Sequence, residues 1–530
     1  MENEKNDVSV DDNKHKHYVL LVSIISTLIF GLLAHGFAFS NLFPSYDSLG
    51  ELGIGSGIHK IKLGRFMYAV LKCLLGESVI MPWLTGMLSL LIIGLASYYT
   101  CKIFNLKRLW QIVLVSAVFS TNLVICGTLA TFGHDLLGNC MALLLSVLSA
   151  YLLRRSLYNI SVNDVFVLIC LVATLGFYQA YIAVTITLMM FVYIIELIEN
   201  KKQKTSKIIL SMLKVGTVIL VACIAYYICA IIASKITHYE LYDTNTYNSI
   251  DIKRITPAML VENFLSVYRV SFETFFVNGV DSFAIASLKF LGDATVLLHV
   301  LLLLFVTVVF CLKIFNEKLH GYSICLICII VILLPIGMNF TSLISGINYI
   351  LMKFALNLVY VLVPIACTYF KDLKLPTLQL KHMTTVAIVL VFLIVAKNIS
   401  VANQVYVKKE LIKNSTLFYT SEIVSRIEKE DIYEYGKTPV VIVGLLIDNS
   451  KTIPAFSEID KMTGVGWRTQ ITYLWHFQRY FDYYLQYDIN LIDYADIANE
   501  DYDQVLEGLE DFPRKNCILV KDGMIFIKLS

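Results

Sequence analysis

The residues best suited to chemistry stand together in one polar stretch, SNLFPSYDSLGELGIGSGIHKIKLGRF, at positions 40–66. This stretch follows the first long apolar segment and is the first part of the chain too polar to lie in lipid. Its ionisable side chains are Asp47, Glu51, His59, Lys60, Lys62 and Arg65. Ionised carboxylates can accept protons, and cations bind phosphate oxygens strongly. Beside a membrane, the combination predicts a site for chemistry on a lipid-linked phosphate.

Asp47 is the preferred general base in this stretch. An exposed aspartate has a pKa near 3.9, so it is ionised at neutral pH. Glu51 and Asp135 are rival carboxylates, and Asp135 follows His134 at another turn on the same predicted side of the membrane. A structural role is the alternative for both aspartates. Asp47 can be a solvated loop residue or a helix cap, and Asp135 can be a first-turn residue of the next helix.

Arg65 is the first candidate to bind the phosphate, with Lys60, Lys62 and Lys353 as further candidates. Lys353 and Lys397 stand near the predicted outer ends of apolar spans, where a charge usually pairs or lines a cavity. Snorkelling of each lysine to the interface is the alternative. One anionic ligand shared with Arg65 would account for both lysines.

The composition indicates a membrane protein. Of its 530 residues, 57% are hydrophobic and 16% are charged, whereas soluble domains are about half apolar and a quarter charged. The net charge of +2 gives no reason to expect a nucleic-acid partner. No secretory signal peptide is evident. The 12 cysteines fall almost all in apolar segments, and no metal-binding pattern, P-loop or GxSxG motif is present.

Apolar runs of about 20 residues can cross a bilayer, and we predict eleven such spans. They are Tyr18–Phe39, Ile80–Ile103, Leu109–Leu129, Leu136–Leu153, Val162–Phe177, Ala180–Ile198, Ile208–Ser234, Ala294–Phe315, Tyr322–Met338, Ile347–Phe370 and Thr384–Val401. Alternate short loops collect the lysines and arginines, which predicts a cytoplasmic N-terminus. The odd number of spans then puts the C-terminus outside.

Three regions follow from these spans. Residues 1–17 form a cytoplasmic tail, residues 18–402 form the membrane domain with outer loops at 40–79 and 235–293, and residues 403–530 form a small outer α/β domain. Within the 235–293 loop, Met259–Phe276 has the apolar spacing of a helix lying along the interface.

Local patterns predict the elements of the C-terminal region. Leu411–Tyr433 is expected to be helical, Thr438–Leu446 to be a buried strand, and Asp522-Gly523 to turn a hairpin. Aromatic residues at helical spacing in Thr472–Tyr484 can form a sugar-stacking surface, although such a cluster is more often core or a face resting on the membrane.

Four segments resemble the Gtr type II glucosyltransferases, integral-membrane enzymes of the GT-C superfamily that decorate bacterial surface polysaccharides. They are Asp47 with the following LGR (Leu63–Arg65), FGHDLLGNCMALLLSVLSAYLLRR (Phe132–Arg155), FYQA (Phe177–Ala180) and FPRKNCILVKDGMIFIKL (Phe512–Leu529). The resemblance implies a polyprenyl-phosphate-linked sugar as donor substrate, with glucose as the default. It also implies a surface glycan acceptor, location in the bacterial cell membrane, and inversion in a single displacement. No cofactor is implied.

The resemblance also implies partners and a sugar site. An enzyme that makes the lipid-linked sugar and a lipid flippase would act before this protein. His134, Tyr178 and Gln179 are candidates to hydrogen-bond sugar hydroxyls, the last two at a break between spans. Two alternatives remain open. A polysaccharide polymerase or ligase would use a larger lipid pyrophosphate donor. A non-enzymatic transporter would often show internal repeats, and the sequence shows none.

Overall fold

The computed structural model describes residues 2–43, 45–49, 57–75, 81–199, 205–242, 255–285, 294–373, 381–446, 454–466, 471 and 474–529. Within these ranges, only the backbone is described for residues 2–15, Tyr46, Asp47, Ile58, Asp372, Lys381 and Pro454.

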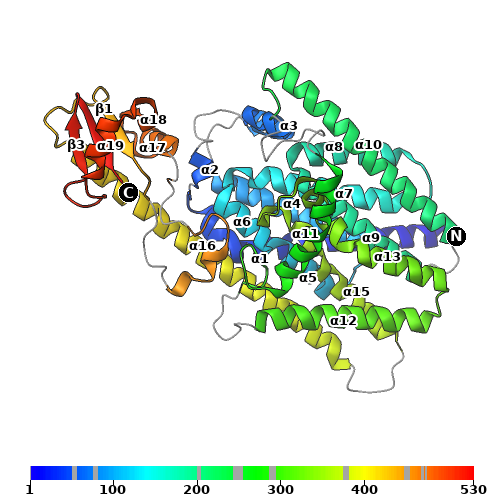
Figure 1. Ribbon diagram of the computed structural model, residues 1–530. Coiled ribbons are helices and arrows are strands. Elements are labelled where there is room, and N and C mark those ends of the chain that lie inside the picture. Colours follow the sequence, from blue (N-terminus) through cyan, green and yellow to red (C-terminus); the bar gives the residue numbers. More distant parts are fainter. Residues whose placement is uncertain are drawn as a thin grey trace.

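Most of the described chain is a bundle of apolar helices (Figure 1). Ten helical segments there are long and apolar enough to cross a membrane, and the 16-residue α8 is a shorter apolar helix. The helices are α1 (Glu2–Phe39), α4 (Pro82–Ile103), α5 (Leu109–Ser120), α6 (Leu123–Thr131), α7 (Leu136–Arg155), α8 (Val162–Phe177), α9 (Ile182–Glu199), α10 (Thr205–Thr237), α12 (Ala294–Glu317), α13 (Gly321–Met338), α15 (Leu362–Asp372) and α16 (Lys381–Ile427). The prediction of a polytopic helical membrane protein is confirmed.

The N-terminus and the C-terminal domain lie at opposite ends of this bundle (Figure 1). We call the end that carries the C-terminal domain the domain end. The α5–α6 segment and α9 are the most enclosed helices, whereas α10 and α13 are the least enclosed. Enclosed helices have protein neighbours on all sides, so their apolar residues pack into one core rather than against lipid.

Two predicted spans are interrupted. The third is divided into α5 and α6 at Asn122, whose Oδ1 accepts hydrogen bonds from the Val124 amide (2.8 Å) and from Asn357 Nδ2 (3.0 Å). The tenth was predicted as one helix over Ile347–Phe370. It instead contains two 3-10 helices, η5 (Ile350–Met352) and η6 (Phe354–Val361), before α15 begins. Sequence could not show this, because apolar composition is the same in α- and 3-10 helices. Lys353 therefore lies between η5 and η6 and precedes the membrane-length segment.

The break predicted near Tyr178 is confirmed. Helix α8 ends at Phe177, and Tyr178 has an extended backbone with φ −154° and ψ 114°. The 3-10 helix η3 (Gln179–Tyr181) then leads into α9.

Helix α16 is longer than predicted. The sequence indicated one span at Thr384–Val401 and a second helix at Leu411–Tyr433, but a single helix of 47 residues covers Lys381–Ile427. At a rise of 1.5 Å per residue its length is about 70 Å. It runs from the bundle into the C-terminal domain (Figure 1), so the predicted boundary at 402–403 falls inside one continuous helix.

The C-terminal domain contains a four-stranded sheet in the order β2-β1-β4-β3. Its strands are β1 (Pro439–Val443), β2 (Asn490–Ile492), β3 (Ile518–Lys521) and β4 (Met524–Lys528). β1 runs parallel to β2 and β4, and β3 pairs with β4 as the antiparallel hairpin predicted at Asp522-Gly523. Both turn residues have positive φ, which an Asp-Gly pair accepts readily.

Helices cover both faces of this sheet. Tyr502 and Leu506 of α19 (Glu500–Glu507) pack with Val441 and Phe526 on one face. The end of α16 and the helix α17 (Leu474–Tyr480) pack with the other. In the described part of the aromatic cluster, residues 474–484, Phe477, Tyr480 and Phe481 are buried in the core, whereas Trp475 is half exposed.

The domain also folds back onto the bundle through residues 454–466, which include η8 (Pro454–Phe456) and η9 (Ile459–Lys461). Ile459, Met462 and Val465 join the core of the bundle. The Thr463 amide and hydroxyl donate hydrogen bonds of 2.9 and 2.7 Å to the Asp281 carboxylate. Asp281 follows α11 (Pro257–Phe276), which is the helix predicted within the 235–293 loop. The domain is thus fastened to the bundle at more than one point.

Candidate active site

A buried ion pair between Lys60 and Asp135 lies at the centre of the candidate site. Lys60 belongs to the 3-10 helix η1 (Ile58–Leu63), and Asp135 ends the short 3-10 helix η2 (Gly133–Asp135). Both residues are 3% exposed. The His134 Nε2 atom lies 3.2 Å from Lys60 Nζ and 3.4 Å from an Asp135 carboxylate oxygen. The structure therefore joins three of the predicted site residues into one polar cluster.

Local sequence explains how η1 brings Lys60 to this position. Gly64 ends η1 with φ 72°, a conformation that glycine adopts without strain. The chain then enters α3 (Phe66–Leu75), where Tyr68 lies beneath the Lys60 ammonium with 5.0 Å between Nζ and the ring centroid. The Tyr68 ring packs directly on Gly138 of α7, where a Cβ atom would come within 2.3 Å of the ring.

Tyr68 and Asn139 are site residues that the sequence analysis missed. The Tyr68 hydroxyl lies within hydrogen-bond distance of the Asp135 backbone oxygen (3.0 Å) and of Asn139 Oδ1 (2.9 Å). Helical spacing was the available signal, because Tyr68 follows Arg65 by three residues and Asn139 follows Asp135 by four.

Arg65 stands beside this cluster and stacks on Tyr178. Its guanidinium carbon lies 4.5 Å from the centre of the Tyr178 ring, a typical cation–π arrangement. Burial raises the pKa of the Tyr178 hydroxyl, the Arg65 guanidinium opposes that rise, and the Asp135 carboxylate adds to it. In the described part of the chain, the buried Nε of Arg65 has no hydrogen-bond partner. A guanidinium held on an aromatic face with an unused donor is suited to an anionic ligand.

Gln179 and Lys62 hold neighbouring segments together. Gln179 Nε2 donates hydrogen bonds of 2.8 Å to the Leu63 carbonyl and to the Tyr226 hydroxyl of α10. The Lys62 ammonium lies 5.8 Å from the centre of the Tyr239 ring. Gln179 thus fastens η1 to α10, and its predicted contact with sugar stays a prediction.

Lys353 and Lys397 both donate hydrogen bonds to the backbone of the turn that follows α11. Lys353 Nζ donates to the Asp281 carbonyl (2.8 Å), and Lys397 Nζ donates to the Phe283 carbonyl (2.6 Å). Burial lowers the pKa of Lys353, and the nearby carboxylates of Asp281 and Glu273 oppose that change. Both lysines thus have a backbone partner, and the anion predicted to bind them together with Arg65 stays a prediction.

Asp47, the general base preferred from sequence, lies on a short helix near the turn that carries Asp135. Asp47 is part of α2 (Tyr46–Leu49), and its side chain is not described; Glu51 lies outside the described residues. The Ser45 hydroxyl hydrogen-bonds the Thr131 carbonyl, only four residues before Asp135. Leu49 is fully buried in the core of the C-terminal domain. The backbone at Asp47 is thus held between the bundle and the domain.

We expect Leu49→Ala to weaken this attachment. Removing a fully buried leucine side chain costs about 2–5 kcal/mol, so the thermal unfolding midpoint in nanodiscs should fall by several degrees, and sugar transfer should fall with it. Leu42→Ala, at a position 38% exposed on the same loop, is the control. An unchanged midpoint and transfer rate in Leu49→Ala would show that α2 does not depend on the domain.

Asp135→Asn should destabilise the protein, because it leaves the buried Lys60 charge without this carboxylate. Breaking a buried ion pair on one side costs about 3–5 kcal/mol, whereas replacing both partners with apolar residues is often neutral. Thermal unfolding should therefore show a large loss for Asp135→Asn and a much smaller one for Lys60→Met/Asp135→Leu. Equal losses in the two variants would contradict this account of the pair.

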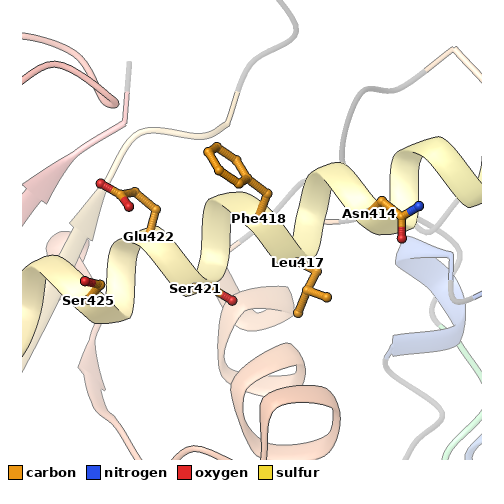
Figure 2. Close-up of a pocket in the computed structure, with 6 residues that line it drawn as sticks. All are labelled: Asn414, Leu417, Phe418, Ser421, Glu422 and Ser425. Atoms are coloured by element: carbon orange, nitrogen blue, oxygen red, sulfur yellow. The ribbon is translucent and has the colours of Figure 1, made fainter.

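A separate hollow of about 510 Å³ lies along the distal part of α16. Figure 2 shows its lining residues, which are Asn414, Leu417, Phe418, Ser421, Glu422 and Ser425. This lining has a carboxylate and no cation, so it does not suit a phosphate group. No group of three or more His, Cys, Asp or Glu side chains that could hold a metal ion occurs among the described residues.

The fold and the cluster together define a polytopic membrane protein with a buried cation–carboxylate centre at the domain end of its helices. The family model Glucosyl transferase GtrII matches residues 36–392, and the chain belongs to that family. The protein is accordingly a membrane glycosyltransferase. No curated protein and no solved structure was found to match the chain. The matched region contains every predicted site residue and ends within α16, before the C-terminal domain.

Proposed function

We propose that this enzyme transfers a hexose, with glucose as the family default, from a polyprenyl-phosphate donor to a cell-surface polysaccharide. The proposal places the domain end outside the bacterial cell membrane, as the distribution of lysine and arginine indicates. The observation that carries it is Arg65, which presents an unused buried donor beside the Lys60–Asp135 pair at that end. An upstream enzyme would make the donor lipid, and a flippase would deliver it to this side.

The chemistry is a single displacement at the anomeric carbon. An acceptor hydroxyl forms the new bond to C1 while the bond from C1 to the phosphate oxygen breaks. The acceptor proton passes to the Asp47 carboxylate, and the lipid phosphate leaves as an anion. Positive charge develops on the sugar in the transition state, as in glycoside hydrolysis. The configuration at C1 inverts, and no sugar–enzyme intermediate forms.

Arg65 is assigned to the leaving phosphate because charge grows there as the bond breaks. Lys60 already has Asp135 as a counter-charge, so its role is to fix η1 and the adjoining turn. The ordered cluster prepares the charges before the substrate arrives, which is the condition under which electrostatic stabilisation is most effective.

A transfer assay with purified enzyme in nanodiscs tests this function. Polyprenyl-phosphate glucose carrying a radiolabelled sugar is supplied with the surface polysaccharide of the source strain. Label should enter the polysaccharide, and free polyprenyl phosphate should appear in equal amount. Transfer from a lipid pyrophosphate oligosaccharide instead would identify a polymerase or ligase. The absence of transfer from either donor would contradict the proposal.

A further inference from the structure

A second polar cavity lies near the candidate active site at the domain end. It has a volume of about 370 Å³ and is formed by α11, the turn that follows it and the segment before η6. Its lining includes Val270, Glu273, Val277, Asp281, Asn348 and Lys353. We propose that this cavity binds a saccharide unit of the acceptor glycan. The inference rests on the proposed function and assigns a place to its second substrate.

The polar groups of the cavity suit hydroxyl groups. Lys353 is 4% exposed and uses one of its three N–H donors on the Asp281 carbonyl. Glu273 supplies carboxylate oxygens, and one of them accepts a 2.7 Å hydrogen bond from Arg269 Nε. Asn348 Oδ1 has no hydrogen-bond partner in the described part of the chain. A sugar hydroxyl both donates and accepts, so it can bond to an ammonium, a carboxylate and an amide.

The same groups make a phosphate ligand less suitable than a sugar. Glu273 and Asp281 bring two carboxylates to a cavity that has one cation, Lys353. A phosphate there would face repulsion from both carboxylates, and like-charge contacts oppose binding. The valine side chains of the lining can instead cover the apolar faces of a sugar ring. Lys353 is thereby reassigned from the donor phosphate to the acceptor.

The cavity is connected to the candidate active site through residues 346–353. The 3-10 helix η5, which begins directly after Tyr349, packs against η3, which begins directly after Tyr178, and Arg65 stacks on Tyr178. Ile350 packs against Gly127 of α6, where an added Cβ would come within 2.6 Å of it. Helix α6 leads to the turn that carries Asp135. A glycan bound in the cavity would therefore contact residues 346–353, which also pack beside the candidate active site.

The cavity is also held in a fixed shape. The Asp281 carboxylate accepts hydrogen bonds from Thr463 of the C-terminal domain and from the Ile350 amide (3.3 Å). These bonds connect three parts of the chain around the Lys353 ammonium. Such preorganisation lowers the entropy cost of binding a ligand.

Glu273→Gln is the main test, because the Glu273 side chain is 44% exposed and the substitution should not disturb folding. Full-length enzyme in nanodiscs is titrated, without donor, with a size-fractionated oligosaccharide pool from the surface polysaccharide of the source strain. Binding is followed by isothermal titration calorimetry. The dissociation constant should rise about tenfold, as expected for one lost charge-assisted hydrogen bond. Glu262→Gln, at an exposed position of α11 outside the cavity lining, is the matched control and should bind like the parent enzyme.

Transfer kinetics then separate acceptor from donor. In Glu273→Gln, the KM for the acceptor should rise while the KM for the lipid donor and the kcat at saturating acceptor stay unchanged. A raised donor KM with unchanged acceptor binding would make the cavity a donor site and overturn the inference. Unchanged binding and kinetics would overturn it as well. Because calorimetry needs no turnover, loss of binding in an enzyme without transfer activity would support the cavity and count only against the proposed function.

Discussion

Asp47→Asn should lower the rate of sugar transfer about 10²–10⁴-fold, the contribution of a general base. Asparagine has nearly the same shape as aspartate but cannot accept the acceptor proton at neutral pH. The substitution should leave thermal unfolding unchanged, because only the proton acceptor is lost. The measurement is single-turnover transfer from radiolabelled donor in nanodiscs. Asp47→Glu should retain part of the activity if α2 can adjust to the longer side chain.

The rival carboxylates need separate controls. Glu51→Gln tests the second carboxylate of the loop under the same conditions. Asp135 cannot be tested by a single amide substitution, because the Lys60 charge it leaves behind would disturb folding. Lys60→Met/Asp135→Leu is the variant to compare. Normal transfer by Asp47→Asn together with loss of transfer in a folded Glu51 or Asp135 variant would show that Asp47 is not the base.

Arg65→Ala should reduce kcat/KM for the lipid donor about 10²–10³-fold, the scale observed when one donor to a developing anion is removed. The structural reason is the buried Nε, which has no partner among the described residues, together with the stacking of the guanidinium on Tyr178. Arg65→Lys should recover part of the rate, since it keeps the charge but loses the planar pair of donors. Donor titrations at saturating acceptor measure both effects.

The matched control for Arg65 is Arg479→Ala on α17 of the C-terminal domain. The Arg479 guanidinium carbon also lies over a tyrosine ring, 5.7 Å from the centre of Tyr483, but outside the candidate site, so its loss should change donor kinetics little. If Arg65→Ala transfers sugar at the parental rate, Arg65 only anchors the loop to Tyr178.

The sequence predicted those features of the fold that depend on local composition. Apolar runs revealed the spans, Tyr178-Gln179 marked the break before α9, and Asp522-Gly523 marked the hairpin. The continuity of α16 was missed, because its composition changes from apolar to charged while its helical geometry does not. The 3-10 helices near Lys353 were missed because nothing in an apolar run separates them from an α-helix.

For the candidate site, the sequence predicted which residues take part but not which of them contact one another. The sequence predicted Lys60, His134 and Asp135 on the same side of the membrane. The pairing of Lys60 with Asp135 joins positions 75 residues apart and depends on how η1 packs against η2. Lys353 was assigned to the donor phosphate from its charge and its position near the predicted outer end of an apolar span. Its carbonyl partner and the carboxylates around it come from segments that only the tertiary fold brings together.

The unbroken course of α16 restricts where this protein can change in length. An α-helix turns about 100° and advances about 1.5 Å with each residue. One residue inserted between Asn403, which bonds to Leu33 of α1, and Ile423, which packs in the domain core, would therefore swing the whole domain around the helix axis. Leu49 would then lose its place in that core, although the bundle and the domain could each still fold. A seven-residue insertion nearly restores the orientation of the domain about the helix axis but moves the domain about 10 Å along that axis. The number of residues between Asn403 and Ile423 thus sets the orientation of the domain relative to the active site. We expect insertions and deletions to be tolerated only in the loops.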